Sequence, residues 1–223
     1  MMTNMFSAFD PATSMNISMN WSMAMLGMLI LPASFWMLPN RMTMVLNMIT
    51  KSLHSEFKTL LCSSSAITLM FISLFMFILM NNFMGLVPYI FTSSSHMTFT
   101  LALALPMWLS IMLFGWINKT TMMLAHMIPS GTPPVLMPFM VMIETISNLI
   151  RPGALAVRLM ANMTAGHILM ALLGEKISSS MTIIPFIIML QMGIMLFESA
   201  VAVIQAYVFS ILSTLYSSEV IYE

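Results

Sequence analysis

Five ionisable side chains lie inside long apolar stretches in the C-terminal half of the chain. They are Glu144, Arg151, Arg158, His167 and Glu198. An arginine at the middle of a membrane helix costs about 2.5–3.5 kcal/mol on insertion scales, so such residues usually face a polar cavity or a partner and mark an ion path. Five of them in two neighbouring stretches therefore indicate a functional site.

Helical spacing arranges the polar residues of these two stretches in two stripes. At about 100° per residue, one face of the first stretch is polar along its length. That face carries Glu144, Asn148, Arg151, Arg158 and Asn162. His167 follows Arg158 by nine residues, about 180° further round the helix, and is expected to point elsewhere. In the second stretch a polar residue recurs every seven positions, at Gln191, Glu198 and Gln205. In an antiparallel pair of helices the two stripes can converge.

The residues divide by what each can do with a proton. Arginine cannot release one at any accessible pH, so Arg158 is a fixed positive charge that attracts carboxylates and repels a passing cation. Glu198 and His167 can both take up and release protons, as a relay requires. Asn162 and Gln205 do not titrate, but their amides can orient carboxylates or water. The pattern predicts a proton path with Arg158 as its gate.

Each residue also has a purely structural interpretation. Arg151 and Glu144 are seven residues apart, and an internal ion pair that only fixes helix packing explains them equally well. Arg158 has no carboxylate within one helical turn in sequence, so its partner must come from elsewhere. A lone histidine such as His167 is as often an interhelical hydrogen bonder. No two histidines are spaced i, i+4 and Cys62 is the only cysteine, so neither a metal site nor a haem or other cofactor is expected.

Composition places these residues in a membrane. The chain has 223 residues, of which 60% are hydrophobic and 6% are charged, against about 25% charged in soluble domains. Seven basic residues balance seven acidic ones, so no polybasic surface exists for a nucleic-acid partner. The expected surroundings are a lipid bilayer.

Three stretches without charge are each long enough for a helical crossing, which needs about 20 apolar residues. They run from Asn16 to Leu38, from Ala66 to Phe91 and from Met97 to Trp116. Between the first two, Arg41 to Leu61 has apolar residues at helical spacing and three of the seven basic residues. This pattern predicts an amphipathic helix in the interface on the cytoplasm-equivalent side. The alternative is a helix outside the bilayer that packs on another subunit.

Two further apolar stretches carry the ionisable residues. The first, Pro134 to Leu173, exceeds the thickness of a bilayer, so it must either break near Pro152 and Gly153 or tilt steeply. The second runs from Met181 to Tyr216, and Glu175 and Lys176 mark the expected connection of an antiparallel hairpin. The sequence therefore predicts one all-α membrane domain (residues 1–223) with about five membrane helices and one interfacial helix.

Two long runs resemble a known family. They extend from Leu149 to His167, read LIRPGALAVRLMANMTAGH, and from Glu198 to Phe209, read ESAVAVIQAYVF. Both resemble the signature of subunit a of the mitochondrial rotary ATP synthase, in the right order. Residues before about 130 match mainly by hydrophobic pattern. With 32 methionines, the chain also looks like an organelle-encoded animal product, and the mitochondrial inner membrane is its expected location.

The resemblance implies a role for each polar residue. Subunit a is the stationary, non-catalytic part that passes protons to and from carboxylates of a rotating c-ring through two offset half-channels. Arg158 matches the essential arginine, which blocks direct passage between them. His167 and Glu198 match the half-channel open to the intermembrane space, Glu144 matches a position near the matrix side, and Asn162 and Gln205 match polar neighbours of the arginine. Other implied partners are peripheral-stalk and further membrane-sector subunits. Arg151 departs from the pattern, because relatives often have an uncharged residue there.

Two other classes of protein compete with this interpretation. A self-contained secondary transporter also uses paired polar helices with a site at mid-membrane, although the sequence contains no inverted repeat. A membrane subunit of a respiratory redox complex would bind haem or quinone. The resemblance favours the ATP synthase over both.

Overall fold

The computed structural model describes most of the chain. Its described residues are 6, 9–13, 17–32, 37–61, 65–88, 90–128, 133–179 and 184–222. The helices in this part are η2 (Met19–Ser22), α1 (Met23–Ile30), α2 (Arg41–Leu61), α3 (Ser65–Leu86), η3 (Ser93–Ser95), α4 (Met97–Asn118), α5 (Thr120–His126), α6 (Met137–Ser179) and α7 (Ile184–Tyr222). The predicted all-α fold class is confirmed.

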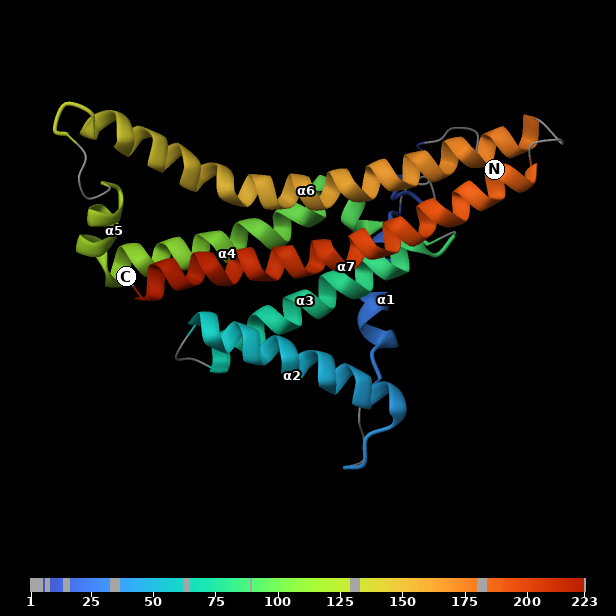
Figure 1. Ribbon diagram of the computed structural model, residues 1–223, viewed down its shortest axis with the longest axis horizontal. Helices are drawn as coiled ribbons and strands as arrows, with labels where there is room; N and C mark the ends of the chain where they lie inside the picture. Colours follow the sequence, from blue (N-terminus) through green and yellow to red (C-terminus); the bar gives the residue numbers. More distant parts are fainter. Residues whose placement is uncertain are drawn as a thin grey trace.

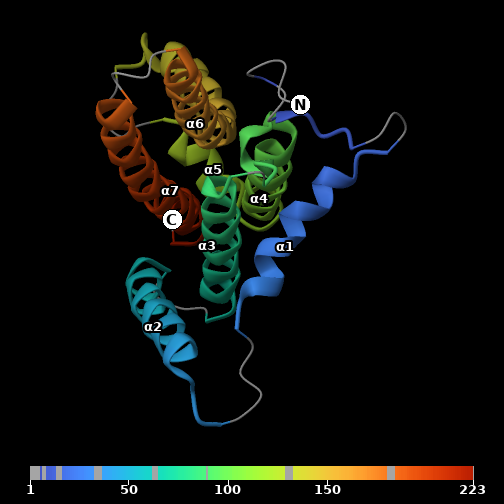
Figure 2. The same cartoon turned by 90° about the vertical axis from the view of Figure 1, so that its right-hand side faces the viewer.

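Four helices of the described part are long and apolar enough to cross a membrane: α3, α4, α6 and α7. Among these four helices, α7 packs along α3 and α6, and α4 packs along α6. Figures 1 and 2 show these four gathered in one bundle, with α2 to one side. The fold therefore places the two long C-terminal helices in contact, as the antiparallel hairpin requires.

The first predicted crossing differs from the structure. Among the described residues of the stretch from Asn16 to Leu38, helix covers Met19–Ile30, about 18 Å at 1.5 Å per residue. Leu31 has ψ near 122°, an extended conformation. The residue that follows is Pro32, and a proline disfavours helix at the residue before it. The prediction of a continuous helix to Leu38 was therefore wrong, while residues 33–36 lie outside the described part.

The bounds of α2 agree with the predicted interfacial segment. Leu53, Phe57 and Leu61 are buried along one face, where they pack on the bundle. Arg41, Lys51 and Lys58 are exposed. Tyr207 Oη on α7 donates a hydrogen bond to Glu56 Oε2 on α2, at 3.0 Å. The helix is thus attached to the bundle through its apolar face and one polar contact, while its position in an interface stays a prediction.

Helix α6 does not break at its proline. It continues through Pro152 from Met137 to Ser179, and Figure 1 shows it as one bowed rod. Prolines are tolerated in membrane helices where neighbouring groups re-satisfy the freed backbone. Glu175 and Lys176, predicted as the connection, lie instead within the last turns of α6. The alternative of a break near Pro152 and Gly153 is therefore not found, and the steep tilt of this helix in a membrane stays a prediction.

Prolines also explain where α3 ends. The predicted crossing extends to Phe91, whereas α3 stops at Leu86, two residues before Pro88. A hydroxyl-rich segment then leads through η3 into α4. Its residues Thr92, Ser93, Ser94 and Ser95 are all buried, because this segment folds back against α3, α4 and α6.

Small side chains allow α6 and α7 to approach the core closely. Ala156, Ala202 and Ala206 are fully buried, and small residues at helix contacts let backbones come together in membranes. Larger residues fill the space between the helices. The main core cluster contains Phe57, Phe71, Phe75, Ile78, Leu155, Leu159 and Phe209.

Candidate functional site

Glu198 and His167 meet at the contact between α6 and α7. Glu198 Oε1 lies 3.9 Å from His167 Nε2, and the side chains are 3% and 19% exposed. Within the described residues, neither oxygen of Glu198 nor Nε2 of His167 has a hydrogen-bond partner. Buried polar atoms are nearly always hydrogen-bonded, and exceptions call for an explanation. We call these two residues the His–Glu pair, an arrangement of two titratable groups that can exchange a proton.

A glycine makes this close approach possible. A Cβ atom on Gly166 would lie 2.6 Å from Cδ of Glu198, so any larger residue would displace the carboxylate. Phe9, from the N-terminal segment, presents its ring edge-on to His167 with 6.2 Å between ring centroids. The His–Glu pair is therefore enclosed by α6, α7 and an N-terminal aromatic residue.

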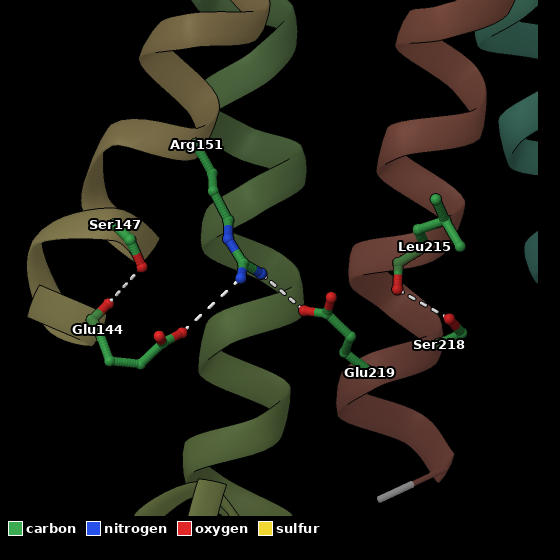
Figure 3. A network of polar contacts seen from close by, with 6 residues as sticks. All are labelled: Glu144, Ser147, Arg151, Leu215, Ser218 and Glu219. Atoms are coloured by element: carbon green, nitrogen blue, oxygen red, sulfur yellow. Dashed lines mark hydrogen bonds and ion pairs between the residues drawn. The ribbon is translucent and has the colours of Figure 1, made fainter. Parts of the chain in front are cut away.

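A second polar group lies toward the other end of the same two helices. Arg151 Nη1 donates to Glu219 Oε2 at 2.6 Å, and Arg151 Nη2 lies 3.7 Å from Glu144 Oε1. Figure 3 shows the guanidinium between the two carboxylates. The guanidinium carbon also lies 5.0 Å from the ring centroid of Tyr216, within the range of cation–π attraction. We call Glu144, Arg151, Tyr216 and Glu219 the Arg151 cluster.

The Arg151 cluster borders a pocket. The pocket has a volume of about 60 Å³, large enough to hold water. Asn148 lines it together with the two carboxylates, and Lys119 and His126 contribute from the α4–α5 side. The structure thus brings together Glu144 and Asn148, which the sequence placed on one stripe, with basic groups from another part of the chain.

Arg158 stands apart from both groups. Its side chain is exposed, and among the described residues it makes no hydrogen bond or ion pair. Along α6 it follows Glu144 by 14 residues and precedes His167 by nine, about 21 Å and 13.5 Å at 1.5 Å per residue. The two polar groups therefore lie in opposite directions from an arginine that none of the described residues neutralises.

The amides predicted beside Arg158 do not contact it directly. Asn162 is partly exposed and Gln205 is 9% exposed. Neither is hydrogen-bonded to the guanidinium in the part of the chain that the structure describes. Among the described residues, no hydrogen bond or ion pair joins the two predicted stripes: Arg151 of the first stripe meets Glu219, and Glu198 of the second meets His167, and both partners lie outside the predicted stripes.

Comparison with known proteins places the chain in a family. The family model for the ATP synthase A chain matches residues 17–218. ATP synthase subunit a of Anopheles quadrimaculatus is 61% identical over 99% of this chain and its own full length. The subunits of Drosophila melanogaster and Locusta migratoria are 59% and 60% identical, with the same coverage.

The chain belongs to the ATP synthase subunit a family.

Membership fixes the general role. Subunit a is the proton-translocating subunit of the membrane sector and associates with other ATP synthase subunits. Its apolar helices fit a multi-pass membrane protein. The predicted resemblance is therefore confirmed, and membership favours the ATP synthase over a self-contained transporter or a redox subunit. Among the described residues, no group of three or more His, Cys, Asp or Glu side chains could hold a metal ion.

Two polar residues of this subunit a chain escaped the sequence analysis. Glu219 continues the spacing of Gln191, Glu198 and Gln205, two steps of seven further on, but the predicted helix ended at Tyr216. Asn82 is fully buried on α3, and its Nδ2 donates to Ala202 O at 3.3 Å. The available signal for Asn82 was the amide pair Asn81–Asn82 inside an otherwise apolar crossing.

Proposed function

We propose that the chain is the stationary proton-channel subunit of a mitochondrial rotary ATP synthase, in the inner membrane. It passes protons through two offset half-channels to and from carboxylates on a rotating c-ring, and it catalyses no ATP chemistry itself. Arg158, Glu198, His167, Glu144, Asn148, Asn162 and Gln205 carry the proton path. The observation that carries this proposal is the position of Arg158, which is exposed, has no ion-pair partner among the described residues, and lies between two polar groups in opposite directions along α6.

The face of α6 around Arg158 suits a neighbouring helix. Ala154, Ala161 and Ala165 lie at i−4, i+3 and i+7 from Arg158, and all three are exposed. Small residues let another membrane helix approach closely. An arginine exposed on such a face is costly in lipid alone and requires a partner charge. A ring helix that carries a carboxylate supplies both the packing and the charge.

The fixed charge converts proton flow into rotation. A carboxylate beside Arg158 is held in its ionised form by the opposite charge, and it must be protonated before it moves away into lipid. The His–Glu pair delivers protons from the intermembrane space, and the Arg151 cluster with Asn148 receives them on the matrix side. A membrane potential supplies about 2.3 kcal/mol per charge per 100 mV, so a direct leak past Arg158 would waste that energy.

A crosslinking experiment tests the assignment of this face. Ala161→Cys is introduced in a chain whose only native cysteine is removed by Cys62→Ser, with a cysteine beside the carboxylate of the ring subunit. Oxidation of the assembled complex should join the chain to the ring. Met48→Cys, exposed on α2, is the matched control and should not crosslink to the ring. Failure of Ala161→Cys to crosslink in assembled complexes would contradict the proposal.

A further inference from the structure

One guanidinium faces two carboxylates in the Arg151 cluster. Arg151 carries one positive charge, whereas Glu144 and Glu219 carry two negative charges when both are ionised. The contact to Glu219 at 2.6 Å is a charge-assisted hydrogen bond, and the 3.7 Å separation from Glu144 exceeds hydrogen-bonding distance. Arg151 is therefore hydrogen-bonded to Glu219 and not to Glu144.

The hydrogen bond to Glu219 is reinforced from α7. Tyr216 lies three residues before Glu219 on the same helix, and its ring lies beneath the guanidinium. Both contacts draw the end of the Arg151 side chain from α6 toward α7. Glu144, on α6 itself, has no hydrogen bond to its carboxylate within the described residues, and it borders the pocket beside Asn148.

A free carboxylate and a clamped one have different chemistry. A carboxylate held by a short bidentate or charge-assisted contact to arginine resists protonation, because protonation breaks the contact. Glu144, at 3.7 Å from the guanidinium, has no such short contact to break. Arg151 has enough reach to contact either carboxylate, so the position of its end group decides which one stays available.

We infer that Glu219 is a positioning residue for proton release: it holds Arg151 against α7 and so leaves Glu144 free to accept and release protons. The inference rests on the proposed function and adds to it a residue that acts through another. It also gives Arg151 a role, since without a competing carboxylate this arginine would close on Glu144, its partner on the same helix.

The test compares variants of the assembled ATP synthase in liposomes, with proton flux through the membrane sector measured per assembled complex. Glu219→Gln releases Arg151, which then closes on Glu144, and flux should fall about tenfold, the factor expected for one charge-assisted hydrogen bond. Glu219→Asp keeps a carboxylate and should retain most of the flux. Ser218→Ala is the matched control, because its hydroxyl donates to Leu215 O in its own helix, at 2.8 Å, and to no other described residue.

The decisive variant is the double change. Arg151→Gln combined with Glu219→Gln removes both the arginine that would close on Glu144 and the carboxylate that holds this arginine against α7. Proton flux should therefore rise well above that of Glu219→Gln alone. A purely structural role predicts the opposite, since the double variant then loses both halves of a contact. Unchanged flux in Glu219→Gln, or no recovery in the double variant, would overturn the inference. Neither result would touch the assignment of the Arg158 face, which the crosslink to the ring tests separately.

Discussion

The two ends of the α6–α7 contact each place a carboxylate opposite a basic side chain, but the two arrangements differ in burial, in the distance between the polar atoms and in hydrogen bonding. The His–Glu pair is buried, and its closest polar atoms, Nε2 and Oε1, are 3.9 Å apart. Neither Nε2 of the histidine nor either carboxylate oxygen has a hydrogen-bond partner among the described residues. The Arg151 cluster is about one-third exposed and contains a 2.6 Å contact. The His–Glu pair is buried and its polar atoms are far apart, whereas the Arg151 cluster borders a pocket and contains a short contact.

The difference shows what a proton carrier needs beyond an acid and a base in proximity. Histidine can lose its proton, whereas arginine cannot, so only the His–Glu pair can pass a proton between its two members. In the Arg151 cluster the base is a fixed charge, and any proton must be carried by a carboxylate that the arginine does not hold. Three experiments test this contrast, beginning with the residue that separates the two sites.

Replacing Arg158 should have the largest effect. Arg158→Ala removes the fixed charge between the two sites, so protons can pass without rotation and coupled ATP synthesis should be abolished while assembly survives. Arg158→Lys should also fail largely, because an ammonium loses its proton more readily and lacks the planar fork of the guanidinium. The measurement is ATP synthesis driven by an imposed proton gradient in vesicles containing the assembled complex. Coupled synthesis retained in Arg158→Ala would show that no fixed charge is needed to block direct proton passage between the two sites.

Glu198→Gln should have the next largest effect. Glutamine has nearly the same shape as glutamate but cannot titrate, so the change removes the proton carrier and leaves the packing. At limiting proton supply on the intermembrane-space side, flux should fall by about 10², the lower end for loss of a general acid–base group. Ser199→Ala is the neighbouring control, since within the described part of the chain its hydroxyl donates to Leu196 O alone. Equal flux in wild type and Glu198→Gln would remove the His–Glu pair from the path.

Sequence reasoning found the long helices and most of the site because charge in an apolar stretch is a strong signal. The rotation of 100° per residue correctly separated His167 from the face of Arg158, and the structure has His167 meeting Glu198 instead. Pro152 was ambiguous from sequence, since a proline within a helix either breaks it or is tolerated, and only the packing around α6 decides. Residue patterns likewise could not show that Arg158 is exposed while Arg151 is engaged.

Glu219 was not predicted from the sequence for a different reason. Glu219 was lost because an apolar pattern was taken to end where charge begins, although helix α7 continues to Tyr222. Its partner Arg151 lies 68 residues away in sequence, and no local rule connects positions that far apart. Long-range pairs of this kind follow from the crossing of α6 and α7, which depends on small residues such as Ala202 and Ala206 in the core.

Replacing glycines on α6 should have the smallest effect, and it tests how closely the two members of the His–Glu pair must lie. A Cβ on Gly166 would overlap the carboxylate of Glu198, whereas a Cβ on Gly174 would meet nothing within 4 Å. Gly166→Ala should therefore push Glu198 away from His167 and slow proton delivery severalfold, less than the loss of the carboxylate itself. Gly174→Ala adds the same methyl group to the same helix and should leave flux unchanged. Flux at limiting proton supply separates the two variants, and equal flux would mean that the His–Glu pair tolerates displacement. Such tolerance is expected of a surface ion pair, but not of a buried relay whose members must lie within reach of one proton.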